Sequence, residues 1–398
     1  MTHYALSPEL SELRGRVRAF VDAHVLPAEA VIMEEDARLD WTTLGQLQQL
    51  ARAEGLWTPH LPEDMGGLGL GIMGMCALFR EMGRSLVGAR VFHCDAPDQG
   101  NMDLLLKAAS PDIQERWLRP LVAGDITSAF CMTEPAPGAG ADPTNLRTTA
   151  IQDGDHWVID GHKWYTTGGN LASFLIVMAR TSEDPRRGCT MFVVDRHAEG
   201  VDHIRDFEVM GPPLLAHREA EFKFHGVRVH RDAILGGVGD GFGLAQTRLV
   251  PARLTHCMRW TGLAARALEM CREYLLSRRS FGKRLADHQL VQKKLADNAI
   301  AIHQGNLMSL HCAQLLESGD HMAARPYSSM AKHHVANTLC QVLDDAIQLH
   351  GGLGYSDDMP FQKWYRWSRA SRIADGPDEV HTMVVARDFL KERFDLVV

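Results

Sequence analysis

Phe174-Leu175-Ile176-Val177-Met178 is the stretch that decides the fold, because an unbroken apolar run of this length predicts a strand buried on both faces. Other short β-rich runs flank it in the chain. The predicted strands are 128–132, 156–159, 162–166, 190–194 and 221–229. Asp160-Gly161, between two of these runs, is typical of a two-residue hairpin turn. A β module therefore occupies the middle of the chain.

Helical patterns lie on both sides of this module. Ser7-Pro8-Glu9 predicts a helix cap and first turn, after which apolar residues recur at helical spacing. Beyond Gly243 the helical patterns become longer, and long helices usually pack as a bundle. We therefore predict an α+β fold with an N-terminal helical domain (1–125), a central domain built as a β-barrel or sandwich (126–240) and a C-terminal long-helix bundle (241–398).

Composition narrows the class of protein. A chain of 398 residues with 45% hydrophobic residues is globular, and a net charge of -8 argues against nucleic-acid binding. The eight cysteines contain no C-x-x-C pair, and no H-E-x-x-H occurs, so we predict no metal site and reduced thiols in a cytoplasmic protein. No apolar stretch approaches the length of a membrane span.

A glycine-rich segment at 69–74 matches G-x-G-x-x-G, the dinucleotide-binding pattern. It follows a loop rather than a strand, and no β-α-β unit surrounds it. We interpret it as a flexible turn before a helix.

The segment 373–381 presents a carboxylate at a break between two helices. Gly376 and Pro377 are typical of a helix end followed by a new start, with Pro at the first helical position. Asp378 and Glu379 suit the positive end of the new helix dipole. Asp375 is compatible with a helix N-cap or with a base presented to a substrate, and these residues alone leave both interpretations standing.

Two predicted strands end in polar turns. Phe130-Cys131-Met132-Thr133-Glu134-Pro135 leaves backbone N–H groups and a hydroxyl free to meet a polar ring. His162-Lys163-Trp164-Tyr165-Thr166-Thr167 carries two large aromatic residues that suit either core packing or a planar cofactor.

Two helix ends are also distinctive. Arg278-Arg279-Ser280-Phe281-Gly282-Lys283 clusters cations where the helix dipole favours them, and where they would also neutralise a pyrophosphate. Gln348-Leu349-His350-Gly351-Gly352 is a glycine run that serves as a helix C-cap or as bare backbone against a ligand.

Together, and in this order, these segments resemble the acyl-CoA dehydrogenase family over essentially the whole chain. Four short motifs match family hallmarks in register: Thr133-Glu134-Pro135, Gly161-His162-Lys163, Ser280-Phe281-Gly282-Lys283 and Gly351-Gly352. The sequences of residues 374–381 and 91–98 are similar to those of one branch of the family. Members of this branch use an aspartate base and are sometimes fused to a kinase-like domain.

The resemblance implies FAD held noncovalently between the β module and the C-terminal bundle, in a homodimer or homotetramer whose second subunit completes the site. The implied flavin-binding residues are Phe130, Met132, Thr133, Tyr165, Thr167, Arg278, Ser280, Phe281, His288, Gln289, Gln348, Gly352, Gly376 and Glu379. Arg253 and Arg387 match positions that bind the CoA thioester. Three residues depart from the family pattern, namely Tyr165, Pro377 and Ala141.

The implied reaction is α,β-desaturation of an acyl-CoA to the trans-2-enoyl-CoA, with electron-transfer flavoprotein as acceptor. Asp375 would remove the α-proton while a hydride passes to flavin N5. Burial in a dry pocket is expected to raise the basicity of such a carboxylate.

Two alternatives remain. The first is a flavin oxidase of a small carbon acid such as a nitroalkane, whose family relatives also use an aspartate; Arg253 and Arg387 argue against it because they suit CoA. The second is a catalytically silent relative that serves as a partner protein, and the presence of Asp375 argues against that role.

Overall fold

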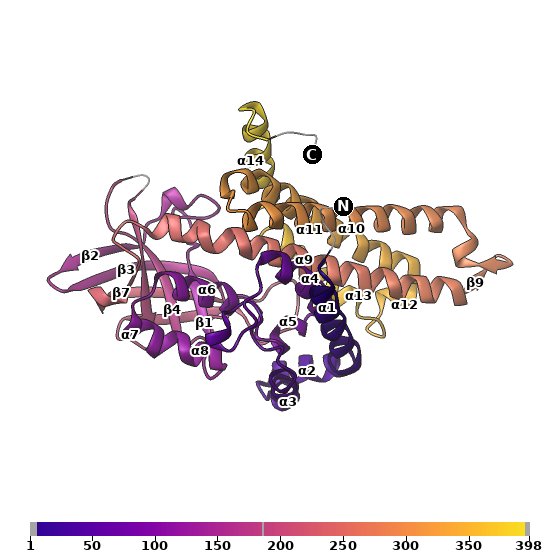
Figure 1. The fold of residues 1–398 in the computed structure, drawn as a ribbon, viewed down its shortest axis with the longest axis horizontal. Coiled ribbons are helices and arrows are strands. Elements are labelled where there is room, and N and C mark those ends of the chain that lie inside the picture. The colour runs from indigo at the N-terminus through magenta and orange to yellow at the C-terminus, as the bar shows by residue number, and fades with distance from the viewer. Residues whose placement is uncertain (1–5, 185–186, 395–398) are drawn as a thin grey trace.

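The computed structural model of the chain describes residues 6–184 and 187–394, arranged as helices, then a sheet, then long helices (Figure 1). Residues 1–5 and 395–398, at the outer ends of the predicted N- and C-terminal domains, lie outside the described residues, as do 185–186. The fold class is as predicted: an N-terminal helical part, a middle β part and a C-terminal helical bundle.

The N-terminal helices pack beside the bundle. Ser7 caps the first of them as predicted, because its hydroxyl accepts a hydrogen bond of 3.2 Å from the Leu10 N–H. Residues 69–71 are irregular and Gly71 is the N-cap of a helix that begins at Ile72, so this segment leads into a helix as predicted. The elements are α1 (Pro8–Phe20), η1 (Val21–Val25), α2 (Leu26–Arg38), α3 (Thr42–Ala53), α4 (Ile72–Met82), α5 (Gly88–Val91), α6 (Asp98–Ala108), α7 (Pro111–Ile113), η3 (Gln114–Leu118) and α8 (Arg119–Ala123).

The sheet is eight-stranded, in the order β6-β7-β3-β2-β4-β5-β8, and β1 pairs with β4 in parallel. Its strands are β1 (Ser128–Cys131), β2 (Thr149–Asp153), β3 (His156–Thr167), β4 (Phe174–Arg180), β5 (Cys189–Asp195), β6 (Val201–Asp206), β7 (Glu219–His230) and β8 (Ile234–Leu235). All of β4 except Arg180 is buried, which confirms the prediction made from its apolar run.

The predicted hairpin turn at Asp160-Gly161 is wrong. β3 continues through these residues, and the turn that joins β2 to β3 lies at 154–155. The pairing of β3 with β7 shifts register between Ile159 and Gly161, which marks a β-bulge. A side chain on Gly161 would collide with the side chain of Thr148, so glycine allows this close approach.

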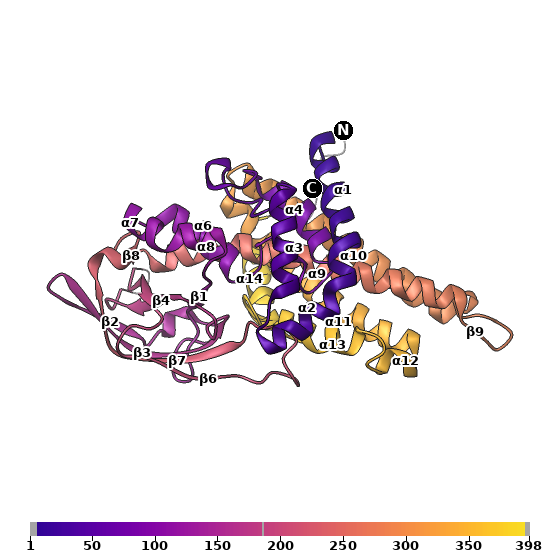
Figure 2. The ribbon, with the colours of Figure 1, turned by 90° about the horizontal axis from the view of Figure 1, so that it is seen from below.

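Long helices form the C-terminal bundle, and α9 reaches from the sheet to the opposite end of the molecule (Figure 2). Pro251 lies inside α9 and cannot donate the backbone hydrogen bond of its position. The elements are α9 (Gly241–Ser277), β9 (Arg279–Ser280), β10 (Lys283–Arg284), α10 (Gln289–Glu317), α11 (His321–His350), α12 (Gly352–Tyr355), α13 (Phe361–Ser368), η7 (Arg369–Arg372) and α14 (Asp378–Leu390).

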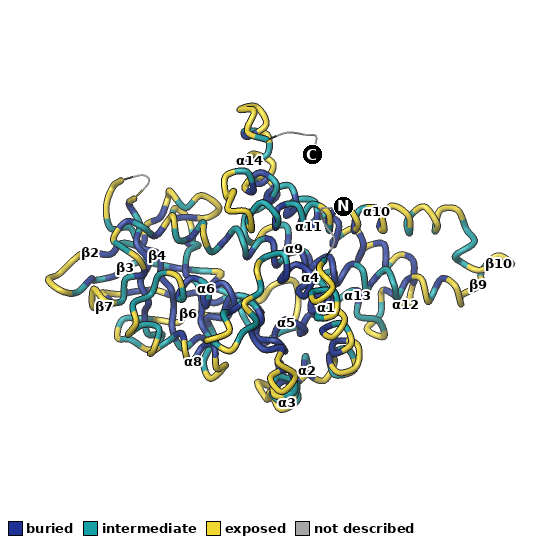
Figure 3. The backbone as a smooth tube through the Cα atoms, in the orientation of Figure 1, coloured by how far each residue is buried: buried dark blue, intermediate teal, exposed yellow. Residues whose placement is uncertain are grey.

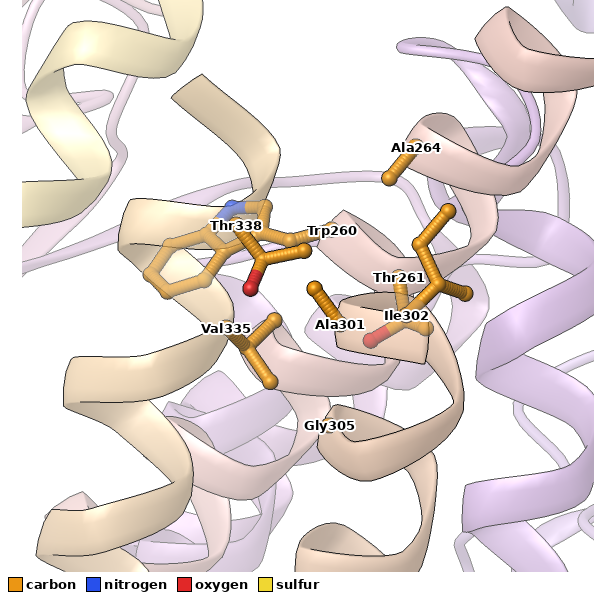
Figure 4. A pocket seen from close by; sticks show the side chains of 8 residues that line it. All are labelled: Trp260, Thr261, Ala264, Ala301, Ile302, Gly305, Val335 and Thr338. Atoms are coloured by element: carbon orange, nitrogen blue, oxygen red, sulfur yellow. The ribbon is translucent and has the colours of Figure 1, made fainter. Parts of the chain in front are cut away.

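The buried residues concentrate where α9, α4 and α11 pack together and within the sheet, whereas the β9–β10 hairpin is exposed (Figure 3). A pocket between α9, α10 and α11 is lined by Trp260, Val335 and other apolar or short side chains (Figure 4). It is a packing gap within the bundle rather than a polar site.

A buried ion pair fixes the ends of β1 and β3 against each other. The Lys163 ammonium lies 2.8 Å from a carboxylate oxygen of Glu134 and also donates to the Met132 carbonyl at 3.0 Å. Both charged side chains are almost completely buried. Burial raises the pKa of Glu134, but Lys163 and the hydrogen bonds to the carboxylate outweigh burial and lower it to about 2.

Replacement of Glu134 by Gln is expected to reduce the free energy of unfolding by about 3–5 kcal/mol at neutral pH, because Lys163 is left as a buried unpaired charge. The folded pKa of about 2 lies below the unfolded value of 4.5, so the carboxylate stabilises the fold above pH 4.5 and loses this effect as pH falls towards 2. Urea unfolding between pH 7 and pH 2.5 measures both effects. Glu34→Gln, which breaks an exposed pair with Arg38, is the control and should change little.

Candidate active site

Asp375 lies on a left-handed turn between η7 and α14. Its φ is 55°, and that of Gly376 is 105°. Aspartate is one of the few residues other than glycine that tolerate this backbone region. Pro377 occupies the N-cap position, and α14 begins at Asp378. The prediction of Pro377 at the first helical position is therefore wrong by one residue, and Asp375 is not the N-cap.

Three helices hold this turn. Arg253 of α9 donates from Nε to the Asp375 carbonyl at 2.9 Å, and Lys332 of α11 donates to the Gly376 carbonyl at 2.6 Å. Nε2 of His381, on α14, lies 3.3 Å from the Asp375 carbonyl. Because the backbone carbonyls are bound in this way, the direction of the Asp375 side chain is fixed by the bundle.

The Asp375 carboxylate is mostly shielded from solvent. One of its oxygens, Oδ2, lies 3.1 Å from Nε2 of His256, and 20% of the side chain is exposed. Among the described residues, Oδ2 has no partner with the full geometry of a hydrogen bond. This buried oxygen therefore lies close to a donor without completing a hydrogen bond.

Burial acts on the basicity of Asp375 in the predicted direction, but neighbouring groups change the outcome. Burial does raise the pKa of the carboxyl, but His256, Arg248 and Arg253 together outweigh it and hold the pKa below its ordinary value. The Asp375 carboxylate is consequently ionised at neutral pH.

Arg248 links the Asp375 carboxylate to the end of β1. Its guanidinium lies over the Phe130 ring, 4.2 Å from the centroid, and its charge attracts Asp375. Its Nε also donates to Asn101 at 2.9 Å. Asp375 and the first predicted flavin-binding strand end are thus brought together.

The ends of β1 and β3 lie side by side. The Trp164 N–H donates to the Thr133 carbonyl at 3.0 Å, so Thr133 lies beside the residue that precedes Tyr165. Tyr165 has a φ of 48°, and its ring stacks on Phe207 with centroids 4.5 Å apart while 47% of the residue stays exposed. The structure therefore groups Phe130, Met132, Thr133 and Tyr165.

Thr167 lies on the same strand, but its hydroxyl is engaged elsewhere. It donates to Glu219 of the neighbouring β7 at 2.8 Å. Burial raises the pKa of Glu219 to about 7. The Thr167 hydroxyl is therefore committed to the sheet in this arrangement.

The other predicted flavin-binding residues are at the opposite end of the molecule. Both ribbon views place the β9–β10 hairpin at the end of the bundle away from the sheet, with α12 also on that side (Figures 1 and 2). Phe281, at the hairpin tip, is 94% exposed. A single chain therefore does not bring this set to the strand ends: Arg278, Ser280, Phe281, His288, Gln289, Gln348 and Gly352. Gly376 and Glu379 lie at the Asp375 turn.

The two arginines assigned to the CoA thioester differ in their surroundings. Arg253 is bound to the carbonyl of Asp375. Arg387 of α14 donates from Nε to Asp388 at 3.2 Å, while its buried Nη2 has no hydrogen-bond partner among the described residues. An unpaired buried donor of this kind suits an anionic ligand.

Two residues at the site, Arg248 and His256, were not predicted from the sequence. They lie on α9, as Arg253 does, and His256 is three residues from Arg253, so these two residues are neighbours on the helix surface. That spacing was the available signal, but the sequence does not reveal which α9 face meets the Asp375 turn.

Three family models match the chain, and together they cover most of it. They are the acyl-CoA dehydrogenase N-terminal domain at residues 7–125, the middle domain at 129–224 and the C-terminal domain at 239–390. The chain therefore belongs to the acyl-CoA dehydrogenase family, a family of flavoprotein oxidoreductases whose cofactor is FAD.

Individual relatives agree with this assignment. The chain is 37% identical to "Probable acyl-CoA dehydrogenase FadE2" of Mycobacterium tuberculosis, over 96% of each chain. It is 35% identical to acyl-CoA dehydrogenase family member 11 of Rattus norvegicus, over 98% of this chain and 51% of that protein. It is similar to a solved acyl-CoA dehydrogenase homologue from Mycobacterium abscessus, with 39% identity, a TM-score of 0.92 and coverage of 98% and 100% of the two chains.

The chain spans about half the length of several curated relatives that it matches, including the rat protein. No helix within the described residues combines the length and apolar character needed to cross a membrane.

The described residues fit FAD. An exposed Tyr165 ring beside the polar strand ends suits a flat isoalloxazine, and the cation-rich β9–β10 hairpin suits a pyrophosphate. Nη2 of Arg387 is a buried donor without a hydrogen-bond partner among the described residues, and it suits an anionic group of an acyl-CoA.

Replacement of Lys332 by Met is expected to lower the free energy of unfolding by about 1–3 kcal/mol, because the Gly376 carbonyl loses its buried donor. Urea unfolding at pH 7 measures the change. Lys293→Met removes an exposed pair with Asp297 on α10 and is the matched control, with an expected effect of about 0.5 kcal/mol or less. Equal losses in the two variants would show that Lys332 does not support the turn.

Proposed function

We propose that this chain is an FAD-dependent dehydrogenase that desaturates an acyl-CoA thioester between its α and β carbons, giving the trans-2-enoyl-CoA. The observation that carries the proposal is the Asp375 carboxylate, which three helices hold on a left-handed turn and which shares Arg248 with the Phe130 end of β1. A base beside the flavin-facing strand end is the arrangement that removal of an α-proton requires.

Asp375 acts as the base. Its side chain stays 20% exposed although Oδ2 is buried beside His256, so the α-proton goes to the other carboxylate oxygen, Oδ1. The lowered pKa keeps the carboxylate ionised before the reaction, and displacement of water by the acyl chain raises its proton affinity within the complex. FAD, when bound, supplies the hydride acceptor.

The turn has a second role towards the thioester oxygen. Arg253 and Lys332 donate to its carbonyls and so fix the backbone of the turn. Backbone N–H groups of the same turn are the proposed donors to the oxygen on which negative charge develops. Arg387, with its unpaired Nη2, is the proposed contact for the CoA portion.

A second copy of the chain is proposed to complete each flavin site. Phe130, Met132, Thr133 and Tyr165 lie at one end of the chain, whereas the β9–β10 hairpin lies at the other. A two-fold pairing brings the hairpin of one protomer to the strand ends of its partner, in a homodimer or homotetramer. Electron-transfer flavoprotein is the acceptor that the family resemblance implies.

The reaction is tested by anaerobic mixing with a series of acyl-CoAs, monitored by bleaching of the flavin absorbance. At least one chain length is expected to reduce the flavin, and Asp375→Asn is expected to slow reduction about a hundredfold or more because the base is removed. Asparagine tolerates the left-handed backbone at this position, so the turn is retained. Reduction of Asp375→Asn at the wild-type rate would refute the assignment of the base.

The same preparation distinguishes the alternatives. Rapid peroxide formation in air from a small carbon acid, without bleaching by any acyl-CoA, would favour the oxidase. A protein that stays colourless after FAD is added would favour the silent partner.

Sharing of the flavin site is tested at the hairpin tip. Phe281→Asp is expected to weaken FAD binding about tenfold to a hundredfold, because a contact worth about 1.5–3 kcal/mol is lost between protomers. Fluorescence titration of FAD and sedimentation measure affinity and assembly. Ile151→Asp, at an exposed apolar residue on β2, is the matched control. Wild-type FAD affinity and assembly in Phe281→Asp would contradict the shared site.

A further inference from the structure

We propose that His256 is a positioning residue for the reaction, holding the Asp375 carboxylate in its productive orientation through Nε2; this rests on the proposed function. His256 lies on α9, and its Nε2 is 3.1 Å from Oδ2 of Asp375. The distance suits a donor, and a small rotation of either side chain would complete the hydrogen bond.

The ring of His256 is held in place by packing. It stacks on Trp260, one helical turn along α9, with centroids 5.3 Å apart and an angle of 23° between the planes. Trp260 is buried and borders the bundle pocket of Figure 4. The imidazole therefore cannot swing away from Asp375 without disturbing the bundle.

Arg259 selects the tautomer of His256. Its Nη2 lies 2.8 Å from Nδ1 of the imidazole. A guanidinium only donates hydrogen bonds, so Nδ1 must accept, and the ring proton of the neutral imidazole is on Nε2, towards Asp375. A second proton on Nδ1 would break the contact with Arg259.

Arg259 is itself anchored by a third residue. Its Nη1 lies 2.5 Å from Oδ1 of Asp95, in the loop between α5 and α6. Burial raises the pKa of Asp95, but Arg259, His217 and Arg90 outweigh burial and keep it below its ordinary value. Asp95, Arg259, His256 and Asp375 thus form a continuous chain of contacts, in which each member orients the next.

This chain matters because Asp375 has competing cations around it. Arg248 and Arg253 on α9 and Lys332 on α11 all attract its charge, and His381 of α14 faces its carbonyl. A carboxylate drawn towards these arginines would point its oxygens away from a substrate. The Nε2 donor of His256, held close to Oδ2, sets the rotation of the Asp375 carboxylate among these cations.

His256→Phe tests the proposal, because phenylalanine keeps a ring against Trp260 and removes both nitrogens. In anaerobic flavin reduction, kcat is expected to fall about tenfold to a hundredfold, since the base is no longer aligned, while KM for the acyl-CoA stays within about twofold. The acidic limb of the pH profile of kcat/KM should move to higher pH, because a donor that favours ionised Asp375 is lost. His256→Gln, which restores a donor near the Nε2 position, should recover most of the rate.

A measurement without turnover supports the kinetic test. Urea unfolding of His256→Phe, Asp375→Asn and the double variant should give non-additive midpoints if the two side chains interact. His225→Phe is the matched control, because His225 pairs with Asp202 on the exposed surface of the sheet. It should leave kcat, the pH profile and the midpoint unchanged.

The outcomes separate this inference from the proposed function. His256→Phe could keep the wild-type kcat and the wild-type acidic limb of the pH profile while Asp375→Asn is inactive. That result would overturn only the role of His256. Loss of stability without movement of the acidic limb would also overturn it, because a purely structural role would not alter the ionisation of Asp375. If His256→Phe does not fold, His256→Asn, which is too short to reach Oδ2, carries the same test. Bleaching by no acyl-CoA in the wild type would instead refute the proposed function.

Discussion

The position of the Asp375 carboxylate depends on hydrogen bonds to the backbone of its own turn. Arg253 and Lys332 bind consecutive carbonyls at 375 and 376, and each donor comes from a different long helix. A left-handed turn with unpaired buried carbonyls would be costly, whereas one whose carbonyls are bound is rigid. The packing of the bundle therefore fixes the direction of the Asp375 side chain, and proton abstraction requires a base that is held in place.

Helix α9 connects the separate parts of the site. Within its 37 residues it carries Arg248 over the Phe130 ring, Arg253 on the Asp375 carbonyl and His256 beside the carboxylate. It then continues to Arg278 at the β9–β10 hairpin. In the sheet, the buried ion pair of Lys163 with Glu134 holds the end of β3 against the end of β1, where Arg248 contacts Phe130.

The sequence predicted the fold well because its strongest signals are local. The apolar run of β4 and the long helical periodicities need no knowledge of distant contacts. The features that the sequence did not predict depend on distant contacts. The bulge at Gly161 depends on β7 and on Thr148, and the lowered pKa of Asp375 depends on cations more than a hundred residues earlier in the chain. His256 was missed for the same reason, since only the packed bundle brings it to Asp375.

Pro251 lies on α9 between the residue that stacks on Phe130 and the residue that binds the Asp375 turn. Because proline has no N–H, one backbone hydrogen bond of the helix is missing at this point, which makes bending there easier. Arg248, which contacts Phe130, and Arg253, which contacts the Asp375 turn, are consequently on opposite sides of this proline. A change in the bend of α9 at Pro251 would therefore change the distance between the Phe130 ring and Asp375.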